Sequence, residues 1–148
     1  MTVGKAFFDT NVLLYMFSAS EPRKQMAAQK LFDDHNEAGQ IVLSTQVVQE
    51  FYVSALRKLE LSLRRVRTLA AELLKLPLVV IAPEQIVTAM DLQERYQISF
   101  WDALIVAAAQ SSGADVVFTE DLNDGQHYGG VLVRNPFLAT SSKSRPKR

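Results

Sequence analysis

Carboxylates stand beside hydroxyl and amide side chains at two places in the chain, each directly after a short apolar run. The two sets are Asp9-Thr10-Asn11, after residues 5–8, and Thr119-Glu120-Asp121, after residues 116–118. An apolar run of this length that ends in polar turn formers is typical of a buried strand. In an open α/β sheet, ligands bind just beyond the carboxyl ends of the strands. The repeated pattern therefore predicts that both sets lie where such a fold carries out its chemistry.

Two further acids are expected at the same edge of the sheet. Glu50 lies in the first turns of a helix that is predicted to begin where a strand at residues 41–43 ends. Asp102 belongs to the helix-start sequence Ser99-Phe100-Trp101-Asp102, in which a serine caps the helix and an acid follows three residues later. The prediction is that four acids converge on one rim: Asp9, Glu50, Asp102 and Asp121.

Four clustered carboxylates need a counter-charge. Each raises the pKa of its neighbours, and each desolvated charge is costly. All-oxygen ligation suits Mg²⁺ or Mn²⁺, whereas Zn²⁺ would recruit histidine or cysteine. The chain has no cysteine, and neither His35 nor His127 has a ligand-like companion nearby in sequence. One or two Mg²⁺ or Mn²⁺ ions can activate a water for attack on a phosphodiester, so the acids predict metal-assisted hydrolysis.

Each acid also has a purely structural interpretation. Asp9 or Asn11 can cap the helix predicted to follow them. Glu50 falls nearly opposite the apolar face of its helix, as expected of a solvated side chain. For Asp102, the structural interpretation is that it serves as the reciprocal partner of the Ser99 cap and has no other role. The convergence of all four acids is what favours a metal site over these alternatives.

The elements that must position these residues alternate along the chain. Short apolar runs predict five strands, at residues 6–8, 41–43, 78–81, 116–118 and 131–133, with a polar loop at 123–130. Helices are predicted from residue 12, from 22 to 38, from 45, from 62 to 76, from 83 to 96 and from 99 to 112. Strands that alternate with helices predict an α/β fold, with a mainly parallel sheet of about five strands and helices on both of its faces.

Length and composition agree with one folded domain. The chain has 148 residues, of which 48% are hydrophobic, enough to build a substantial core. We predict a single domain over residues 1–138 and a basic, disordered tail over residues 139–148. No apolar run approaches the roughly 20 residues of a membrane span, and the first residues lead straight into a strand. A cytoplasmic protein is the simplest expectation.

The net charge of zero hides an asymmetry. Four of the 16 basic residues lie within the last six positions, so the other 142 residues carry 12 basic and 16 acidic groups. The domain itself is therefore not typical of a general polyanion binder. Its densest positive segment comprises Arg57, Lys58, Arg64, Arg65 and Arg67. Such a run is usually a solvated helical face, with contact to phosphates as the alternative.

Together these motifs resemble those of PIN-domain ribonucleases of the VapC toxin type. The resemblance covers residues 5–137 and rests on Asp9-Thr10-Asn11, Gln49-Glu50-Phe51, Trp101-Asp102-Ala103-Leu104-Ile105 and Thr119-Glu120-Asp121. It implies a PIN-like three-layer fold and Mg²⁺- or Mn²⁺-dependent endonucleolytic cleavage of RNA. It also implies a homodimer and a small cognate antitoxin that inserts a segment into the active-site groove.

The resemblance assigns roles to single residues. It implies that Asp9, Glu50 and Asp102 match the three principal acids of the family and that Asp121 takes its more variable fourth position. It further implies that Asn11 and Thr119 assist around the acids. Glu120 is the alternative fourth acid, because Glu120, Asp121 and Asp124 crowd this part of the chain. The wide apolar face around Tyr52 is a candidate dimer surface.

The sequence thus predicts a metal-dependent endoribonuclease that acts as the toxin of a toxin–antitoxin pair. Two alternatives stay open at this point. A phosphatase would use Asp9 as a nucleophile, although phosphatases of the haloacid dehalogenase type usually have a second aspartate where Asn11 stands. A non-catalytic module that binds nucleic acid or protein would keep the acids for structural reasons.

Overall fold

A mainly parallel sheet forms the middle layer of the protein, which we describe from a computed structural model over residues 3–138. Within that range the sheet has six strands in the order β3-β2-β1-β4-β6-β5. The strands are β1 (Ala6–Phe8), β2 (Ile41–Ser44), β3 (Leu78–Val79), β4 (Val116–Phe118), β5 (His127–Tyr128) and β6 (Val131–Arg134). All neighbouring pairs are parallel except β5 with β6. The expected mainly parallel α/β sheet is confirmed.

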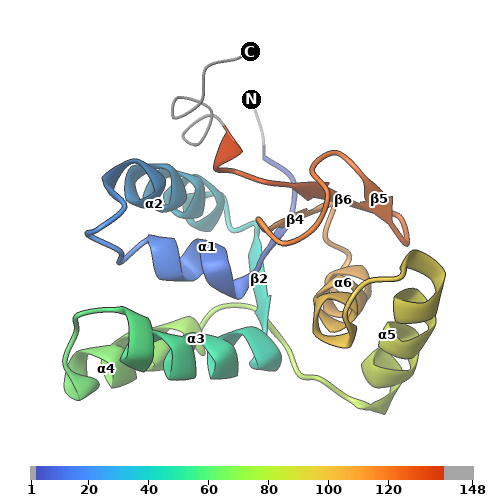
Figure 1. The fold of residues 1–148 in the computed structure, drawn as a ribbon, viewed down its shortest axis with the longest axis horizontal. Helices are drawn as coiled ribbons and strands as arrows, with labels where there is room; N and C mark the ends of the chain where they lie inside the picture. Colours follow the sequence, from blue (N-terminus) through green and yellow to red (C-terminus); the bar gives the residue numbers. More distant parts are fainter. Residues whose placement is uncertain (1–2, 139–148) are drawn as a thin grey trace.

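The described residues form six helices around the sheet. They are α1 (Thr10–Tyr15), α2 (Pro22–Glu37), α3 (Thr45–Lys58), α4 (Leu63–Leu73), α5 (Pro83–Tyr96) and α6 (Phe100–Ser112). Figure 1 shows α1 and α2 on one side of the central strands and α5 and α6 on the other, while α3 and α4 pack together below α1. The predicted three-layer arrangement is therefore present. No helix in residues 3–138 combines the length and the apolar character needed to cross a membrane.

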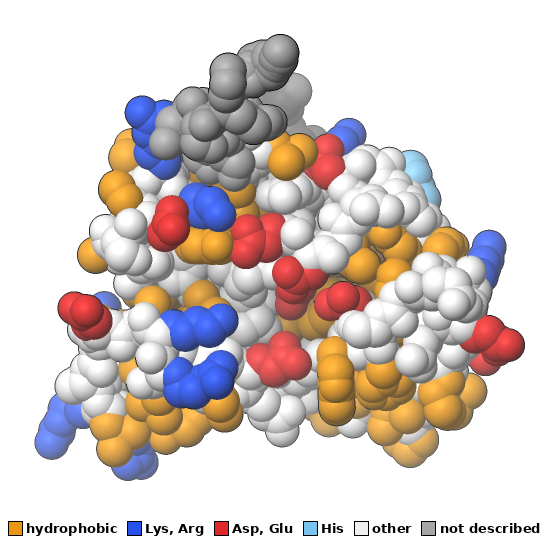
Figure 2. All heavy atoms as spheres, in the orientation of Figure 1, with side chains coloured by type: hydrophobic (Ala, Val, Ile, Leu, Met, Phe, Trp, Pro, Cys, Tyr) orange, Lys and Arg blue, Asp and Glu red, His pale blue; other side chains and the backbone are white. Residues whose placement is uncertain are grey.

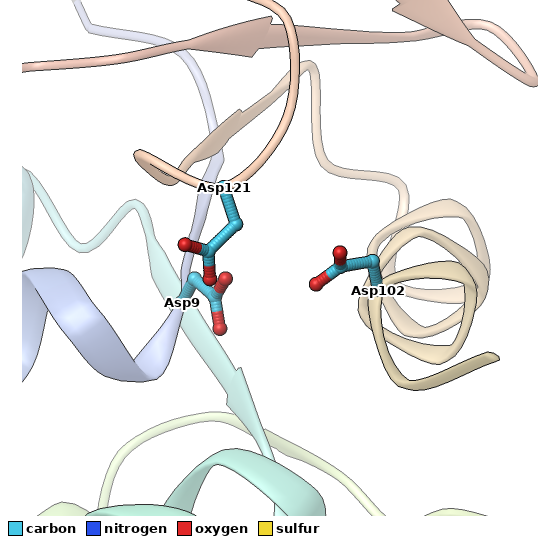
Figure 3. A group of neighbouring side chains, drawn as sticks. All are labelled: Asp9, Asp102 and Asp121. Carbon is cyan, nitrogen blue, oxygen red and sulfur yellow. The ribbon is translucent and has the colours of Figure 1, made fainter. Parts of the chain in front are cut away.

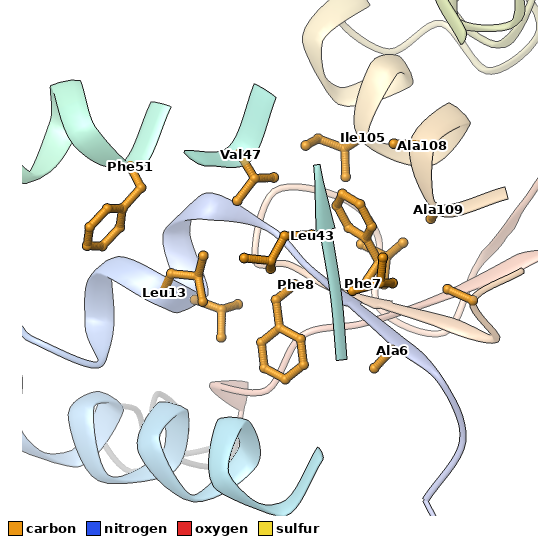
Figure 4. Packing of buried hydrophobic residues seen from close by; sticks show 14 of the residues in the cluster. Ala6, Phe7, Phe8, Leu13, Leu43, Val47, Phe51, Ile105, Ala108 and Ala109 are labelled. Atoms are coloured by element: carbon orange, nitrogen blue, oxygen red, sulfur yellow. The ribbon is translucent and has the colours of Figure 1, made fainter. Parts of the chain in front are cut away.

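The core lies on both faces of the central strand β1. Phe8 points to the side of α1 and α2, where Leu13 also lies (Figure 4). The centroid of its ring is 5.9 Å from that of the Phe32 ring. Phe7 points to the opposite side, toward Ile105 of α6 (Figure 4). Successive residues of a strand face opposite sides, so the fully buried run Ala6–Phe8 is what a strand covered by helices on both faces requires. This packing holds the end of β1, and therefore Asp9, in a fixed place.

One strand differs from the expected topology. The segment expected as a polar loop over residues 123–130 contains β5, which forms an antiparallel hairpin with β6. The hairpin turns at Gly129 and Gly130, whose φ angles are 56° and 87°. Glycine adopts positive φ without steric cost, and a Gly-Gly pair between strands is a hairpin signal. The sheet consequently has one strand more than expected.

The third strand is shorter than expected. Only Leu78 and Val79 pair with β2, whereas the apolar run predicted a strand to residue 81. The Ile81 amide donates instead to the Thr45 hydroxyl at 3.1 Å, so the chain leaves the sheet before α5 begins. The basic tail predicted for residues 139–148 lies outside the described residues.

Candidate metal centre

Three aspartates meet beyond the carboxyl ends of the central strands. One carboxylate oxygen from each of Asp9, Asp102 and Asp121 lies within 4.8 Å of the other two. Asp9 follows β1, Asp121 follows β4, and Asp102 lies in the first turn of α6. Figure 3 shows the Asp102 carboxylate directed from its helix toward the other two. Residues from both ends of the domain, Asp9 and Asp121, are thus brought to one point with Asp102, as expected from the strand ends.

Asp9 is both a helix cap and a member of this cluster. Its Oδ1 accepts a hydrogen bond from the Thr10 amide at 2.7 Å, at the start of α1. Its Oδ2 accepts from the Thr119 hydroxyl, also at 2.7 Å. The side chain is only 5% exposed. The capping and the metal interpretations of Asp9 therefore hold together rather than exclude each other.

Asn11 and Thr119 hold Asp121 beside Asp9. The Asn11 side-chain amide donates to Asp121 Oδ2 at 2.9 Å and to the Thr119 hydroxyl at 3.3 Å. The Asp121 amide also donates to the Thr119 hydroxyl, at 3.0 Å. The two polar residues that the sequence singled out thus position the acids, with Thr119 in contact with both aspartates.

Glu50 faces the same pocket but lies outside the three-aspartate group. Its Oε1 accepts from the Thr10 hydroxyl at 3.0 Å, and its Oε2 accepts from the Gln46 side-chain amide at 3.2 Å. The side chain is half-buried, whereas helical periodicity alone favoured a solvated position. Periodicity misleads here because α3 overhangs the strand ends, so its polar side faces the cluster instead of bulk water.

Burial strongly favours the protonated form of Asp9. Removal from water raises its pKa from about 3.8 to about 7, and the hydrogen bonds from Thr119 and Thr10 only partly oppose this. The negative charges of Asp121 and Glu50 also contribute to this raised pKa, as smaller causes than burial. A cation within the cluster would reverse the effect, because it stabilises the charged carboxylate.

Asp102 shows the same tendency more weakly. Burial raises its pKa, the Ser99 hydroxyl lowers it, and the charges of Asp121 and Glu50 raise it. The Ser99 hydroxyl also accepts from the Asp102 amide at 3.0 Å and so caps α6. The helix cap therefore uses the backbone of Asp102, while its carboxylate faces the cluster (Figure 3).

The donor set fits a hard divalent cation. The three aspartates offer only oxygen, which is the ligand type that Mg²⁺ and Mn²⁺ prefer. The buried carbonyl oxygen of Asn11 has no hydrogen-bond partner within the described residues, and it lies on the side chain that binds Asp121. An unpaired buried acceptor is unfavourable, so this side-chain oxygen is suited to accept a hydrogen bond from a water at the site.

The cluster lies in a pocket of about 520 Å³. One wall is formed by α3, through Gln46, Glu50 and Lys58 among others, and the facing wall includes Trp101 and Asp102 of α6. Figure 2 shows acidic side chains gathered at the centre of this face, basic ones to their left and hydrophobic ones below and to the right.

The amino-acid sequence matches the family profile of the PIN domain over residues 6–124. The chain belongs to the PIN-domain family. The match begins in β1 and includes all four acids predicted from the sequence.

Solved structures share the fold of this PIN domain. A toxin–antitoxin complex from Klebsiella pneumoniae superposes with a TM-score of 0.69 at 22% identity, covering 89% of this chain and 98% of the other. A DNA-bound VapBC complex from Salmonella typhimurium superposes with a TM-score of 0.66 at 16% identity, covering 90% of this chain and 99% of the other. VapC20 from Mycobacterium tuberculosis is a toxin that cleaves the sarcin–ricin loop. It superposes with a TM-score of 0.64 at 18% identity, covering 79% of this chain and 90% of the other. No curated protein sequence matches the chain. At these identities the likeness establishes the fold.

Gln46 is a residue of this PIN domain that sequence reasoning missed. It is 5% exposed, and its side-chain amide donates to Glu50 Oε2 at 3.2 Å and to the Trp101 carbonyl at 3.3 Å. It therefore fixes Glu50 and ties the start of α3 to the start of α6. Its position four residues before Glu50 on one helix was the available signal, since such residues are neighbours on the helix surface.

We predict that Gln46→Glu impairs the site far more than Gln49→Glu. The first change replaces two donors with a carboxylate beside Glu50, so we expect a loss of about 1–3 kcal/mol in the free energy of unfolding in chelator. Gln49 lines the same pocket without a side-chain hydrogen bond in the described structure and controls for the added charge. Denaturant unfolding of both variants in chelator measures the difference. Equal behaviour of the two variants would remove Gln46 from the site.

Glu120 is directed away from the PIN-domain acids. It accepts from the Tyr15 hydroxyl at 3.0 Å and lies 3.6 Å from the Lys24 ammonium. Asp124, the other nearby acid, accepts from the Asn135 amide at 2.8 Å. Of the three acids after β4, the structure therefore brings Asp121 to Asp9. Spacing alone could not decide this, because the chain turns directly after the strand.

Paired substitutions test this placement. We expect Asp121→Asn to lower metal-dependent cleavage by at least about 100-fold, because it removes a charge from the reacting centre. Glu120→Gln should leave the cleavage rate nearly unchanged and cost about 1 kcal/mol of stability through the Tyr15 and Lys24 contacts. Single-turnover cleavage and thermal unfolding of both variants give the comparison. The reverse order of activities would make Glu120 the fourth acid.

Proposed function

We propose that this PIN domain is a Mg²⁺- or Mn²⁺-dependent endoribonuclease and the toxin of a toxin–antitoxin pair. The observation that carries the proposal is the convergence of Asp9, Asp102 and Asp121 within 4.8 Å, with Glu50 in the same pocket. The similar folds of a toxin–antitoxin complex and of VapC20 support the biological role. A small antitoxin and a second copy of the chain are the proposed protein partners.

The residues of the chain divide the work in this proposal. Asp9, Asp102 and Asp121 would hold the cation, which when bound would supply Lewis-acid activation of a water and of the scissile phosphodiester. Thr119 fixes the orientation of Asp9 through its hydroxyl, and Asn11 does the same for Asp121 through its amide. Pre-oriented carboxylates lower the barrier because they need little rearrangement during the reaction.

Glu50 is the proposed acceptor of the proton released by the attacking water. Thr10 and Gln46 each donate to one of its oxygens, which fixes the carboxylate toward the pocket. An ionised carboxylate has about four acceptor positions, so two remain for water and substrate. A general base must lie within hydrogen-bonding reach of the proton that it takes.

Cleavage of a panel of structured RNAs, with Mn²⁺ or with chelator, tests the proposal. Attack by water leaves no 2′,3′-cyclic phosphate, and it does not need the ribose 2′-hydroxyl. We therefore expect Mn²⁺-dependent cleavage that persists when the nucleotide at the cleavage site carries 2′-deoxyribose. Cyclic-phosphate products, or cleavage resistant to chelator, would refute the water mechanism. A folded protein that cleaves none of the RNAs would favour a binding module.

A further inference from the structure

Two residues on the rim of the pocket are not used by the proposed chemistry. Trp101 is 61% exposed although it is adjacent to Asp102, and it lines the pocket. Lys58 is exposed at the last turn of α3 and lines the same pocket. We infer that Trp101 stacks on a base of the RNA substrate and that Lys58 contacts a backbone phosphate, so that the RNA runs along α3 between them. This inference rests on the proposed ribonuclease function.

The Trp101 indole is held ready for stacking. Its ring meets the Phe100 ring edge-to-face at 5.1 Å, and its backbone carbonyl accepts from Gln46 of α3. A single exposed apolar side chain is common on protein surfaces. An exposed indole at the rim of a nuclease pocket is different, since aromatic rings in proteins that bind single-stranded RNA provide stacking surfaces for bases.

Lys58 carries the positive charge in a pocket whose other charged lining residues are acidic. It is the one Lys or Arg among the pocket-lining residues, and within residues 3–138 it forms no salt bridge. A second, smaller pocket next to Tyr15 and Glu120 also includes Lys58, so the ammonium lies where the two hollows adjoin. Figure 2 shows basic side chains to the left of the central acids. A phosphate of an incoming chain would meet this cation without first displacing an ion pair.

The two residues are spaced for a short stretch of RNA. Gln46 binds the Trp101 carbonyl near the start of α3, and Lys58 ends the helix. The helical rise over these 12 residues is about 18 Å, several nucleotides at the stacked spacing of about 3.4 Å. Glu50 lies between them on the same helix. The reacting phosphate would therefore lie between a stacked base and a paired phosphate.

Intrinsic fluorescence tests the stacking directly, because Trp101 is the only tryptophan in the chain. The Asp9→Asn protein is titrated in Mg²⁺ buffer with a single-stranded 12-nucleotide oligo(U). The control ligand is an abasic oligonucleotide of the same length, with the same sugar–phosphate backbone but no bases. We expect saturable quenching by the first and little by the second. In the same background, Trp101→Ala should weaken oligo(U) binding about tenfold by anisotropy, and Trp101→Phe should restore most of it. Met90→Ala, a change of another exposed apolar side chain, on α5, should have no effect.

Salt dependence tests Lys58. Loss of one phosphate contact on a single strand should reduce the slope of log affinity against log salt by about 0.7 in Lys58→Ala. The adjacent exposed Arg57 does not line the pocket, so Arg57→Ala should keep the wild-type slope. In cleavage assays, where Asp9 is left intact, Trp101→Ala and Lys58→Ala should both raise KM more than they lower kcat.

The outcomes separate this inference from the proposed function. Mn²⁺-dependent cleavage with unchanged KM in Trp101→Ala and Lys58→Ala would overturn the RNA path while the ribonuclease stands. Absence of quenching, or equal affinities of Trp101→Ala and Met90→Ala, would also overturn it. A Trp101→Ala protein with altered oligomeric mass and unchanged RNA affinity would assign the indole to contact with another copy. Failure of the wild-type protein to cleave any RNA would instead refute the proposed function.

Discussion

Asp9→Asn is expected to abolish metal-dependent RNA cleavage, by at least about 1,000-fold, while the protein stays folded. Asp9 contributes an oxygen to the three-aspartate cluster and is the most buried of its members. Asparagine has nearly the same size as aspartate and keeps one hydrogen-bond acceptor oxygen, but it carries no negative charge. Single-turnover cleavage in Mn²⁺ measures the loss, and growth inhibition on expression should disappear with it.

The same variant should be no less stable than the wild-type protein when cations are removed. The charge of Asp9 is desolvated and close to Asp121 and Glu50, so its loss relieves repulsion. Asp33→Asn, on the exposed side of α2, is the matched control and should retain full cleavage. An Asp9→Asn protein that is unfolded in chelator would show that Asp9 serves chiefly as a helix cap.

Stability without cations should fall as the pH rises from about 4 to about 8. Burial raises the pKa of Asp9 to about 7, so the folded protein holds a proton that the unfolded chain releases near pH 3.8. This contribution is complete below pH 3.8 and is lost as the pH passes through 7. It amounts to at most about 4 kcal/mol, because each pH unit between the two pKa values is worth about 1.4 kcal/mol. Urea unfolding in chelator across this pH range measures it.

Mg²⁺ or Mn²⁺ should restore the stability at high pH. A cation at about 100 times its Kd stabilises a folded protein by about 2.7 kcal/mol. Binding at pH 6.5 should also release protons, because the cation favours ionised Asp9. Asp9→Asn should flatten the pH dependence and reduce the cation effect. If the free energy of unfolding of the wild-type protein changed with neither pH nor Mn²⁺, the acids would not form a cation site.

Much of this fold could be predicted because local signals agreed with the global topology. Short apolar runs that end in polar residues located β1 and β4, and the ends of parallel strands share one edge. The hairpin of β5 was missed because two residues show no periodicity, although Gly129 and Gly130 carried the turn signal.

The details of the site were less accessible to sequence reasoning. Helical periodicity placed Glu50 toward solvent, since it describes one helix and not what that helix overhangs. Gln46 matters only through its contacts to Glu50 and Trp101, and the second of these spans 55 positions in sequence. Whether Glu120 or Asp121 faces Asp9 depends on one turn after β4, which a residue count does not determine.

Mapping of RNA ends after incubation of total RNA is the most direct test of the metal-dependent ribonuclease. Wild-type and Asp9→Asn proteins are compared in chelator and after Mn²⁺ is added back. We predict discrete new ends that appear only with wild-type protein and Mn²⁺, at the same positions in repeated experiments. Cleavage by Asp9→Asn at the wild-type rate, or wild-type cleavage that persists in chelator, would contradict a catalytic cation held by Asp9, Asp102 and Asp121.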